Sequence, residues 1–428
     1  MVPDSLAPLD TALVARAGDP IGIAVAGAGW LGKRVAVQVD HITGLKLRVV
    51  ANRSVERAAE QLRADGFDAV ITNDLNELGR INDRDQVAVV ADPHLAAQAT
   101  RVDAVIETTG DFDFGTRTAT AAIAAGKHVV IGAELDATIG PELKRRADEQ
   151  GVVATGMDGD EPAVNMNLLR LVRTMGLQPV MAGNIKGFLN HYRDPETQIA
   201  FAATWGQNPR FMASFADGTK LASECAILGN ATGFGIWQRG MRGFEIPAIG
   251  DLPARLDASE LLAAPKVDYA WGAAPGAGGF VVAHEGDEER SKSLHYLKMG
   301  EGPLHVFTRP FHLPHLEVPL SAARAVLWHD AAITALGAPV LEVIALAKRT
   351  LEPGEVLDGV GGFAWYGLVE TAAVASSEGL LPMGLAEGAT VTRRLAPDTP
   401  IRYDDVEVAD SSVANVRRAQ DNRAFPEP

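Results

Sequence analysis

Short apolar runs alternate with helix-compatible segments over the first 160 residues of the chain. The runs are apolar at consecutive positions, which is typical of parallel strands that are buried on both faces. The pattern predicts an α/β fold with a doubly wound sheet of six strands. We expect the strands at Ile21–Ala26, Leu45–Ala51, Val87–Val90, Ala104–Ile106, His128–Ile131 and Val152–Ala154, with intervening helices that include Ser54–Asp65, Thr116–Ala125 and Gly140–Gln150.

This alternation ends after Gly156, and mixed elements follow. From about residue 336, turn signals such as Glu352-Pro-Gly separate short β-like runs, and we expect the charged tail that follows to be frayed. The pattern therefore predicts three segments: a Rossmann-type domain (17–160), an α+β domain (161–335) and a small β-rich domain (336–428). In the second segment we expect helices at Glu161–Met175, Leu221–Leu228 and Leu320–His329, strands at Val180–Lys186, Phe211–Phe215 and Phe280–Ala283, and a loop at Trp271–Gly279.

Composition narrows the class of protein. The 428 residues carry a formal net charge of -16, whereas nucleic-acid partners require a positive field, so we expect no nucleic acid as a partner. A small anionic substrate remains compatible, because it needs only a few local cations. The single cysteine, Cys225, permits no intramolecular disulfide. Without a leader-like start or a run of about 18 apolar residues, we expect a cytoplasmic protein that does not bind membranes.

The strongest motif is Gly27-Ala28-Gly29-Trp30-Leu31-Gly32, between an apolar run and a helix-compatible stretch. Gly27 permits a tight turn, Gly29 lets the backbone approach a pyrophosphate, and Gly32 lets the helix pack closely on the strand. The helix N-terminus then offers free N–H groups to the phosphates. The motif, with Trp30 and Leu31 inside it, predicts a dinucleotide site; the alternative is an ordinary glycine turn.

The end of the second strand bears on which dinucleotide is bound. Asn52, Arg53 and Ser54 stand about 25 residues after Gly27, where an NAD site usually has an acidic residue. A guanidinium and a hydroxyl suit a 2′-phosphate, and Arg57 follows one turn later. We therefore predict NADP(H), unless Arg53 is only a solvated loop cation.

Thr108, Thr109 and Gly110 close the fourth predicted strand. Loops at the carboxyl ends of parallel strands face the cofactor crevice, so we expect this segment beside the ribose or the nicotinamide. A plain strand-ending turn would have the same composition.

Two lysines are candidates for proton transfer. Lys186 ends the apolar strand Val180–Ile185, and Lys220 lies in Asp217-Gly-Thr-Lys before an apolar helix. A lysine in a partly dry pocket can polarise a carbonyl or accept a proton from an alcohol. The alternative for each is a surface lysine at the end of an element.

Carboxylates cluster after the sixth predicted strand. Asp158, Asp160 and Glu161 could bind a divalent cation or substrate hydroxyls, or could shift one another's pKa values toward acid–base use. Alternatively, Asp160 caps the following helix.

Polar residues later in the chain are candidates for substrate contacts. Arg309, His312 and His315 could bind a phosphate or a carboxylate, and His191 and Arg193 lie in a loop after Lys186. Pro314 argues against a helix that presents both histidines to a metal ion. The sequence has no Ser–His–Asp, P-loop or zinc signature.

Several motifs together resemble a known family. The chain resembles the homoserine-dehydrogenase-like proteins with a C-terminal SAF domain, whose best-known members are the 1-deoxy-D-xylulose 5-phosphate reductoisomerase-like enzymes, from about residue 17 to 410. The motifs are Gly126-Lys-His-Val-Val, Met157-Asp-Gly-Asp-Glu-Pro, Asp217-Gly-Thr-Lys, Asn230-Ala-Thr-Gly, Lys298-Met-Gly-Glu-Gly-Pro, Arg309-Pro-Phe-His-Leu, Glu317-Val-Pro-Leu-Ser and Ala347-Lys-Arg-Thr-Leu-Glu-Pro-Gly.

The resemblance implies an NADPH-linked catalytic core, a β-clip SAF domain after residue 335, and a homodimer formed through the middle domain. It implies that a lysine and an acid transfer protons, which points to Lys186, Lys220, Glu161 and Asp217. Two places depart from the family pattern: the segment from Gly183 to Asp194, and His315. Both departures concern substrate recognition, so the hydride chemistry carries over better than the substrate.

Three functions remain open. The first is a reductoisomerase that acts on a keto-sugar phosphate such as 1-deoxy-D-xylulose 5-phosphate, with Mn²⁺ or Mg²⁺ holding the substrate oxygens. The second is an NADP-dependent dehydrogenase of a small hydroxy or oxo acid, or of a polyol, without isomerisation. The third is a non-catalytic NADP(H)-binding redox sensor, which would not need paired lysines and carboxylates.

Overall fold

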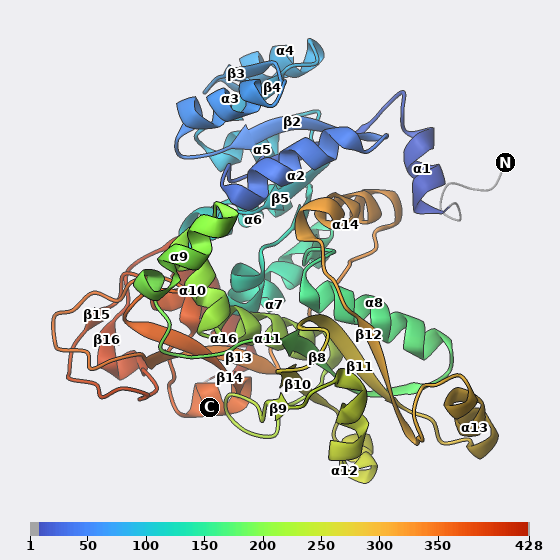
Figure 1. Cartoon of the computed structure of the whole chain (residues 1–428). Helices are drawn as coiled ribbons and strands as arrows, with labels where there is room; N and C mark the ends of the chain where they lie inside the picture. Colours follow the sequence, from blue (N-terminus) through green and yellow to red (C-terminus); the bar gives the residue numbers. More distant parts are fainter. Residues whose placement is uncertain (1–7, 427–428) are drawn as a thin grey trace. The chain divides into compact units, whose positions relative to one another are not determined.

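A seven-stranded parallel sheet organises the first part of the chain (Figure 1). The computed structural model describes residues 8–426, which divide into two compact units. Unit 1 contains the chain up to Asp160 together with Leu313–Thr334, and unit 2 contains Glu161–His312 together with the residues from Ala335 onward. The elements of unit 1 are α1 (Leu9–Ala15), β1 (Ile21–Ala26), α2 (Trp30–His41), β2 (Leu45–Ala51), α3 (Val55–Ala64), β3 (Ala69–Ile71), α4 (Leu75–Asp83), β4 (Val87–Val90), α5 (Pro93–Gln98), β5 (Ala104–Glu107), α6 (Phe112–Ala124), β6 (His128–Val130), α7 (Ala133–Gln150), β7 (Ala154–Thr155) and α14 (Pro314–Trp328).

The strand order in unit 1 is β3-β4-β2-β1-β5-β6-β7, and each neighbouring pair is parallel. The chain leaves β1 toward β2 and later returns to the other side of β1 as β5. Ligands of such sheets bind at the carboxyl ends of the strands where this reversal occurs. The predicted α/β doubly wound fold is confirmed, with β3 as a seventh strand that the sequence pattern did not reveal.

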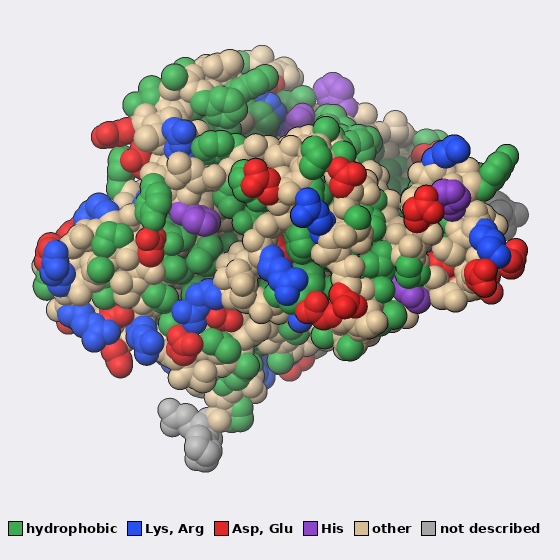
Figure 2. Space-filling view, turned by 60° about the horizontal axis from the view of Figure 1, so that its bottom comes forward, with side chains coloured by type: hydrophobic (Ala, Val, Ile, Leu, Met, Phe, Trp, Pro, Cys, Tyr) green, Lys and Arg blue, Asp and Glu red, His purple; other side chains and the backbone are tan. Residues whose placement is uncertain are grey.

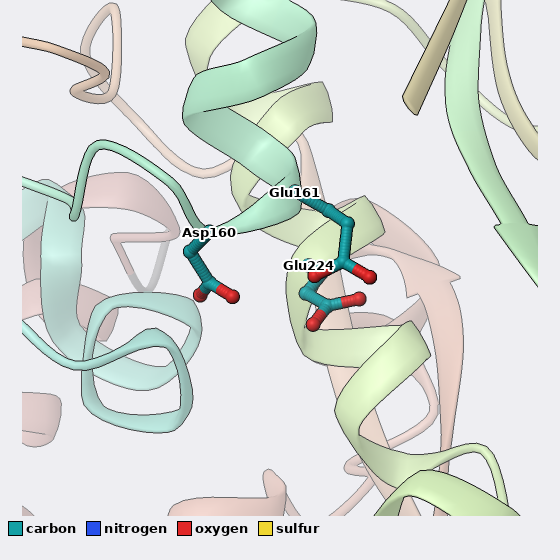
Figure 3. Close-up of side chains that lie close together, drawn as sticks. All are labelled: Asp160, Glu161 and Glu224. Atoms are coloured by element: carbon teal, nitrogen blue, oxygen red, sulfur yellow. The ribbon is translucent and has the colours of Figure 1, made fainter. Parts of the chain in front are cut away.

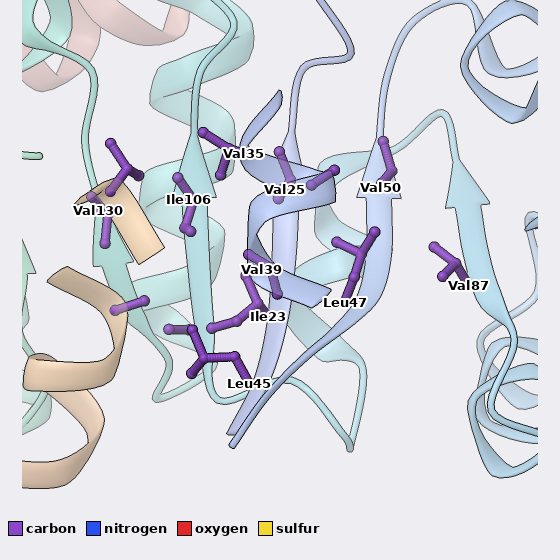
Figure 4. Packing of buried hydrophobic residues seen from close by; sticks show 14 of the residues in the cluster. Ile23, Val25, Val35, Val39, Leu45, Leu47, Val50, Val87, Ile106 and Val130 are labelled. Atoms are coloured by element: carbon purple, nitrogen blue, oxygen red, sulfur yellow. The ribbon is translucent and has the colours of Figure 1, made fainter. Parts of the chain in front are cut away.

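The core of unit 1 explains why α14 belongs to it. Ile23, Val25 and Ile106 of the central strands pack with Val35 and Val39 of α2 (Figure 4). The same buried cluster includes Val318, Ala322 and Ala323 of α14, and α14 packs against α2. Helix α14 therefore completes the cover of the sheet, although about 160 residues separate it from β7 in the sequence.

Unit 2 is built on a mixed five-stranded sheet in the order β12-β11-β8-β10-β9. Strand β8 is parallel to β10 and antiparallel to β11, and helices α8 and α11 pack against it. Its elements up to His312 are α8 (Glu161–Thr174), β8 (Gln178–Lys186), α9 (Pro195–Trp205), α10 (Pro209–Ala216), α11 (Thr219–Thr232), β9 (Phe244–Glu245), the 3-10 helix η2 (Ile249–Arg255), α12 (Ala258–Ala263), β10 (Lys266–Trp271), β11 (Ala277–His284), α13 (Glu288–Tyr296) and β12 (Leu304–Arg309).

The C-terminal part of unit 2 is rich in short β elements, as predicted. Its hairpin β13–β14 packs on α11, where Thr219 Oγ1 accepts a hydrogen bond from the Gly367 N–H at 2.9 Å. These contacts explain why it clusters with unit 2, and its identity as a SAF domain stays a prediction. The elements are β13 (Leu341–Ala347), β14 (Trp365–Thr371), α15 (Ala372–Ser377), η3 (Met383–Leu385), β15 (Thr390–Val391), η4 (Tyr403–Asp405), β16 (Val406–Glu407) and α16 (Ser412–Ala424).

The structure corrects several local predictions. Phe211–Phe215 is not a strand but part of α10, because Asn208 accepts a hydrogen bond from the Arg210 N–H and Pro209 starts the helix. The predicted loop Trp271–Gly279 shrinks, because β10 ends at Trp271 and β11 begins at Ala277. The charged tail forms helix α16 as far as Ala424.

The division into compact units also differs from the three predicted segments. The boundary after residue 160 coincides, but residues 313–334 join unit 1 and residues 335–428 cluster with 161–312. The physical reasons are the packing of α14 on α2 and of β13–β14 on α11. The three-domain assignment itself stays a prediction.

The surface and the helices bear on the expected partners. Lysine and arginine side chains are interspersed with aspartate and glutamate on the face drawn in Figure 2. Among residues 8–426, no helix has the length and apolar character needed to cross a bilayer. The absence of nucleic-acid and membrane partners, the homodimer and the cytoplasmic location stay predictions.

A buried histidine makes the stability of unit 1 depend on pH. His128 Nδ1 accepts a hydrogen bond from the Val153 N–H at 3.1 Å, and its ring lies 5.0 Å from that of His329. Burial, together with the His329 charge, lowers the pKa of His128 to about 4. The folded state therefore favours the neutral form of His128 more than the unfolded state does. The contribution of neutral His128 to the free energy of unfolding is fully present above pH 6.5 and is lost as the pH falls toward 4.

We predict that His128→Asn, which keeps an acceptor for Val153, removes about 2 kcal/mol of the pH dependence of unfolding. Urea unfolding at several pH values in this window measures it, with the exposed His41→Asn as the control. An unchanged pH slope would show that His128 is not the responsible group.

Candidate active site

The glycine motif forms a tight turn at the carboxyl end of β1. Gly27 has φ +99°, and Gly29, which precedes the first turn of α2, has open space where a Cβ would stand. A Cβ on Gly32 would lie 2.1 Å from the Gly27 carbonyl oxygen and 2.5 Å from Thr108 Oγ1. The geometry of each glycine agrees with its place in the motif: a tight turn with positive φ at Gly27, open backbone at Gly29 and close helix–strand packing at Gly32. Their role in binding a dinucleotide stays a prediction.

The neighbouring strand ends complete this turn. Asn52 Oδ1 accepts a hydrogen bond from the Ala28 N–H at 3.2 Å, and Thr108 Oγ1 donates to the Ala26 carbonyl at 2.8 Å. Asn52 and Thr108 therefore shape the turn from either side of β1.

Thr109 and Gly110, which follow Thr108, shape the loop after β5. Thr109 donates to buried Glu107 through its hydroxyl and its N–H, and Gly110 has φ +65°. Burial raises the pKa of Glu107, and the Thr109 hydrogen bonds oppose this.

The predicted 2′-phosphate ligands lie at the end of β2. Arg53 is three-quarters exposed and pairs with Asp111 at 3.0 Å. Ser54 precedes α3 but makes no capping hydrogen bond through its side chain, and Arg57 is exposed on that helix. The Ser54 hydroxyl and the two guanidinium groups are thus placed on the solvent side of the turn.

The aromatic residue of the motif, Trp30, makes an unexpected contact. Its ring lies 5.8 Å edge-on from His315, and the Arg34 guanidinium stacks 3.9 Å from its centroid. Burial and the Arg34 charge lower the pKa of His315. His315 therefore lies beside the dinucleotide turn in unit 1, and Leu31 is half-buried in the same turn.

Four residues with candidate chemistry meet in unit 2 around Lys186. Its Nζ lies 2.9 Å from Glu161 Oε1 and 3.2 Å from Glu224 Oε2. Lys220 Nζ lies 3.8 Å from Glu224 Oε1. We call Glu161, Lys186, Lys220 and Glu224 the Lys186 cluster. Figure 3 shows the two carboxylates side by side, Glu161 on the first turn of α8 and Glu224 on α11.

Burial and charge set the ionisation of this cluster. The side chains of Glu161 and Glu224 are 3% and 0% exposed, and that of Lys186 is 16% exposed. Burial alone would raise the pKa of Glu161, but the charges of Lys186 and His312 outweigh it and lower that pKa. Burial would lower the pKa of Lys186, but the two glutamates raise it above its usual value. Lys186 is therefore an ammonium at neutral pH.

His312 is the other sequence candidate that reaches the cluster. Its Nε2 lies 3.4 Å from Glu161 Oε1. Within residues 8–426, His312 Nδ1 and the second Glu161 oxygen, Oε2, are buried and have no hydrogen-bond partner. A buried polar atom without a hydrogen-bond partner is costly, and a bound ligand that contacts it would remove that cost. Both atoms are therefore candidates for contact with a ligand.

Glu224 was not among the residues singled out from the sequence. It lies inside the predicted apolar helix Leu221–Leu228, four positions after Lys220. That i, i+4 spacing places the two side chains on one helix face and is the signal that could have revealed it.

Asp217, His191 and Arg193 belong to a different neighbourhood of unit 2. Asp217 is buried and pairs with Lys348 Nζ at 2.9 Å, while Lys348 also donates to the Arg193 carbonyl at 2.7 Å. Burial raises the pKa of Asp217, and the Lys348 charge opposes it. His191 Nδ1 lies 2.7 Å from the Asp217 carbonyl oxygen, so these residues tie the loop after β8 to the C-terminal part. This arrangement favours a structural role for Asp217.

The remaining candidates are two acids near the end of the first segment of unit 1 and one arginine of unit 2. Asp158 lies in unit 1, pairs with Arg324 at 3.1 Å and accepts a hydrogen bond from Ser321, which favours a structural role. Asp160 is the buried last residue of the first segment of unit 1. Arg309 lies at the end of β12 with its guanidinium 4.5 Å from the Phe311 ring. The substrate and metal roles assigned to these three residues stay predictions.

Comparison with known proteins places the cluster within a matched domain. Residues 159–318 match the family model described as oxidoreductase DRL, catalytic domain, which is less than half of the chain. The matched segment contains all four residues of the Lys186 cluster and His312. No curated protein matches the chain.

Solved structures show only distant similarity. A probable dehydrogenase from Thermotoga maritima is 14% identical over 61% of this chain and 72% of its own, with a TM-score of 0.37. A putative NADPH-dependent oxidoreductase from Desulfitobacterium hafniense is 14% identical over 73% and 89%, with a TM-score of 0.38. DOX-P reductoisomerase in complex with NADPH, fosmidomycin and magnesium is 15% identical over 49% and 58%, with a TM-score of 0.33. These TM-scores are too low to carry an argument.

The Rossmann topology of unit 1 and the catalytic-domain match agree at the level of class. The prediction that the chain is an oxidoreductase is confirmed by that match, and the parallel sheet with its glycine turn agrees with a nicotinamide cofactor. The choice of NADP(H), the substrate, the metal and the individual site roles lie beyond that statement.

Removing the Lys186 ammonium should show how much its charge contributes to the stability of the cluster. We predict that Lys186→Met lowers the free energy of unfolding at pH 7 by about 3 kcal/mol, because two buried carboxylates lose their ammonium. The loss should shrink as the pH falls, since buried glutamates without a cation become protonated more readily in the folded state. Denaturant unfolding at pH 7 and pH 5 measures both effects.

Lys292→Met is the matched control, because the ion pairs of Lys292 with Glu288 and Glu289 on α13 are exposed. Equal effects of the two substitutions on unfolding would contradict the electrostatic account of the cluster.

Proposed function

We propose that the chain catalyses NADP(H)-dependent hydride transfer at a CH–OH or carbonyl carbon, with Lys186 as the proton donor. One observation carries the proposal. A partly accessible ammonium is held between two buried carboxylates, inside the segment that matches an oxidoreductase catalytic domain. If the ion pairs of Lys186 with the two glutamates had only a structural role, they would gain nothing from leaving Lys186 partly open to solvent.

The geometry suits the reductive direction. Reduction of a carbonyl adds a hydride to carbon and a proton to oxygen, and NADPH supplies the hydride when it is bound. Protonated Lys186 polarises the carbonyl and gives the proton to the oxygen, while Glu161 and Glu224 orient the ammonium. A substrate hydroxyl can donate to Glu161 Oε2, which has no partner within the described residues.

The preference for NADP(H) rests on the end of β2. Arg53 and Arg57 are exposed cations, and Ser54 has a hydroxyl that makes no capping hydrogen bond. The three side chains suit a 2′-phosphate, which would replace Asp111 as the partner of Arg53.

A keto-sugar phosphate such as 1-deoxy-D-xylulose 5-phosphate is the first substrate we propose. The family resemblance supports it, and the catalytic-domain match is compatible with it at the level of an oxidoreductase. Isomerisation of such a substrate calls for a divalent cation that holds two oxygens. Glu161 and Glu224 are hard oxygen ligands close together (Figure 3).

Those residues do not fit a resident cation beside a protonated Lys186. The ammonium already contacts an oxygen of each glutamate, so a divalent cation would compete with it for the same ligands. The proton transfer proposed for Lys186 needs no metal ion.

The second candidate is dehydrogenation of a small hydroxy or oxo acid, or of a polyol, without isomerisation. The same competition favours it, because this reaction needs no cation. The cluster also balances two lysines with two glutamates, which leaves little positive charge for a phosphate. The third possibility, a non-catalytic sensor, does not account for the Lys186 cluster.

We predict that the purified protein oxidises NADPH with 1-deoxy-D-xylulose 5-phosphate, assayed with and without added Mg²⁺ or Mn²⁺, and that Lys186→Arg lowers kcat by at least about 100-fold. Arginine keeps the positive charge between the glutamates but does not give up a proton. Absorbance of NADPH measures the rate, and the NADPH dissociation constant should remain within about 2-fold.

Several outcomes separate the candidates. Turnover of hydroxy acids or polyols without a metal, and none of the sugar phosphate, would select the second function. Full activity of Lys186→Arg would refute the proton-donor role. NADPH binding without turnover of any substrate class would favour the sensor.

The cofactor preference is a separate prediction. Arg53→Ser should weaken NADPH binding by about 10- to 100-fold through loss of a charge-assisted contact, and should leave NADH binding nearly unchanged. Fluorescence titration with both cofactors measures this, with exposed Arg80→Ser as the control. Equal weakening of NADPH and NADH would contradict the 2′-phosphate assignment.

A further inference from the structure

Two buried asparagines stand in line behind Glu224. Asn184 Nδ2 donates to Glu224 Oε2 at 2.6 Å, and Asn165 Nδ2 donates to Asn184 Oδ1 at 3.0 Å. Asn165 and Asn184 are 0% and 1% exposed. They come from α8 and β8, so three elements meet at this chain of hydrogen bonds.

The Glu224 carboxylate determines which group donates and which accepts in each of these hydrogen bonds. Ionised Glu224 only accepts hydrogen bonds, so Asn184 must present its NH₂ group to it and its Oδ1 to Asn165. Asn165 then points its own Oδ1 toward Gly279, where it has no hydrogen-bond partner among residues 8–426. A Cβ at position 279 would lie 2.3 Å from that oxygen.

Packing alone does not explain these residues. Leucine fills such a volume without leaving a buried oxygen unpartnered, so the pair of amides carries a cost that an apolar pair avoids. Alternation along β8 puts Asn184 and Lys186 on the same face, two positions apart. The strand therefore presents to Glu224 both an amide donor and the ammonium.

We infer that Asn184, itself oriented by Asn165, is a positioning residue that holds Glu224 against Lys186. The inference deepens the proposed function and rests on it for the role of Lys186 as proton donor. Without the amide donor, Glu224 Oε2 loses the 2.6 Å hydrogen bond from Asn184, and the carboxylate can turn toward Lys220, whose Nζ is 3.8 Å from Oε1. Lys186 is then held mainly by Glu161.

A double-mutant cycle tests this inference. Asn184→Leu and Glu224→Gln should each lower kcat by about 10- to 100-fold while the NADPH dissociation constant stays within about 2-fold. The double variant should be no slower than Glu224→Gln, because Asn184 acts through Glu224. Asn184→Gln, which keeps an amide, should recover part of kcat.

Asn230→Leu is the matched control. Asn230 is also a buried asparagine of unit 2, but its Oδ1 accepts hydrogen bonds from the backbone of Val340 and Leu341. It should lower thermal stability and leave kcat of the folded protein unchanged.

A second readout needs no substrate. The rate at which an amine-reactive reagent, acetic anhydride, labels Lys186 at one fixed pH can be followed by peptide mass spectrometry. Labelling should become about 10-fold faster in Asn184→Leu and remain unchanged in Asn230→Leu. Gly279→Ala, which pushes on Asn165 from the neighbouring strand, should give an intermediate rate and covers the case in which Asn184→Leu fails to fold.

The outcomes distinguish this inference from the proposed function. Additive kcat losses, or unchanged Lys186 labelling in a folded Asn184→Leu protein, overturn the positioning role and leave the proposed function intact. Faster labelling together with no turnover of any substrate class supports the positioning of Lys186 and refutes the proposed function.

Discussion

The burial of two carboxylates is the constraint on which the candidate site depends. Glu161 and Glu224 are almost entirely inaccessible, and an isolated buried carboxylate is too costly to persist in ionised form. Lys186 compensates both, Lys220 adds a second cation, and Asn184 adds a directional donor. Three elements, α8, β8 and α11, must pack at one place to bring these groups together. The packing of unit 2 therefore creates the candidate site.

Much of the arrangement could be predicted from local sequence. The strand–glycine–helix order around Gly27 specified its left-handed turn and the close packing at Gly32, because these features depend on residues a few positions apart. Lys186 stood out because a charge ended an apolar strand. Glu161 stood out because it began a helix after clustered acids. In each case the residues that made the pattern recognisable lay within one element or one turn.

Other features were missed, some because they depend on contacts between distant parts of the sequence and some because a local signal was overlooked. The partner of Asp217 is Lys348, 131 residues later, so local sequence could not show that this acid forms an ion pair in the interior. Helix α14 joins unit 1 through packing against α2, which no periodicity reveals. Phe211–Phe215 looked like a strand because its apolar run outweighed the Asn208-Pro209 helix start. Glu224 was hidden by the apolar residues around it.

The central claim is that Lys186 is a stable ammonium held by both glutamates. The ¹³Cε resonance of isotopically labelled Lys186, assigned with Lys186→Arg, reports its protonation as the pH is raised. We expect the resonance to keep the ammonium position beyond the usual lysine pKa of about 10.4, and Glu224→Gln to lower the midpoint. A midpoint near or below the usual value in the unaltered protein would contradict the claim.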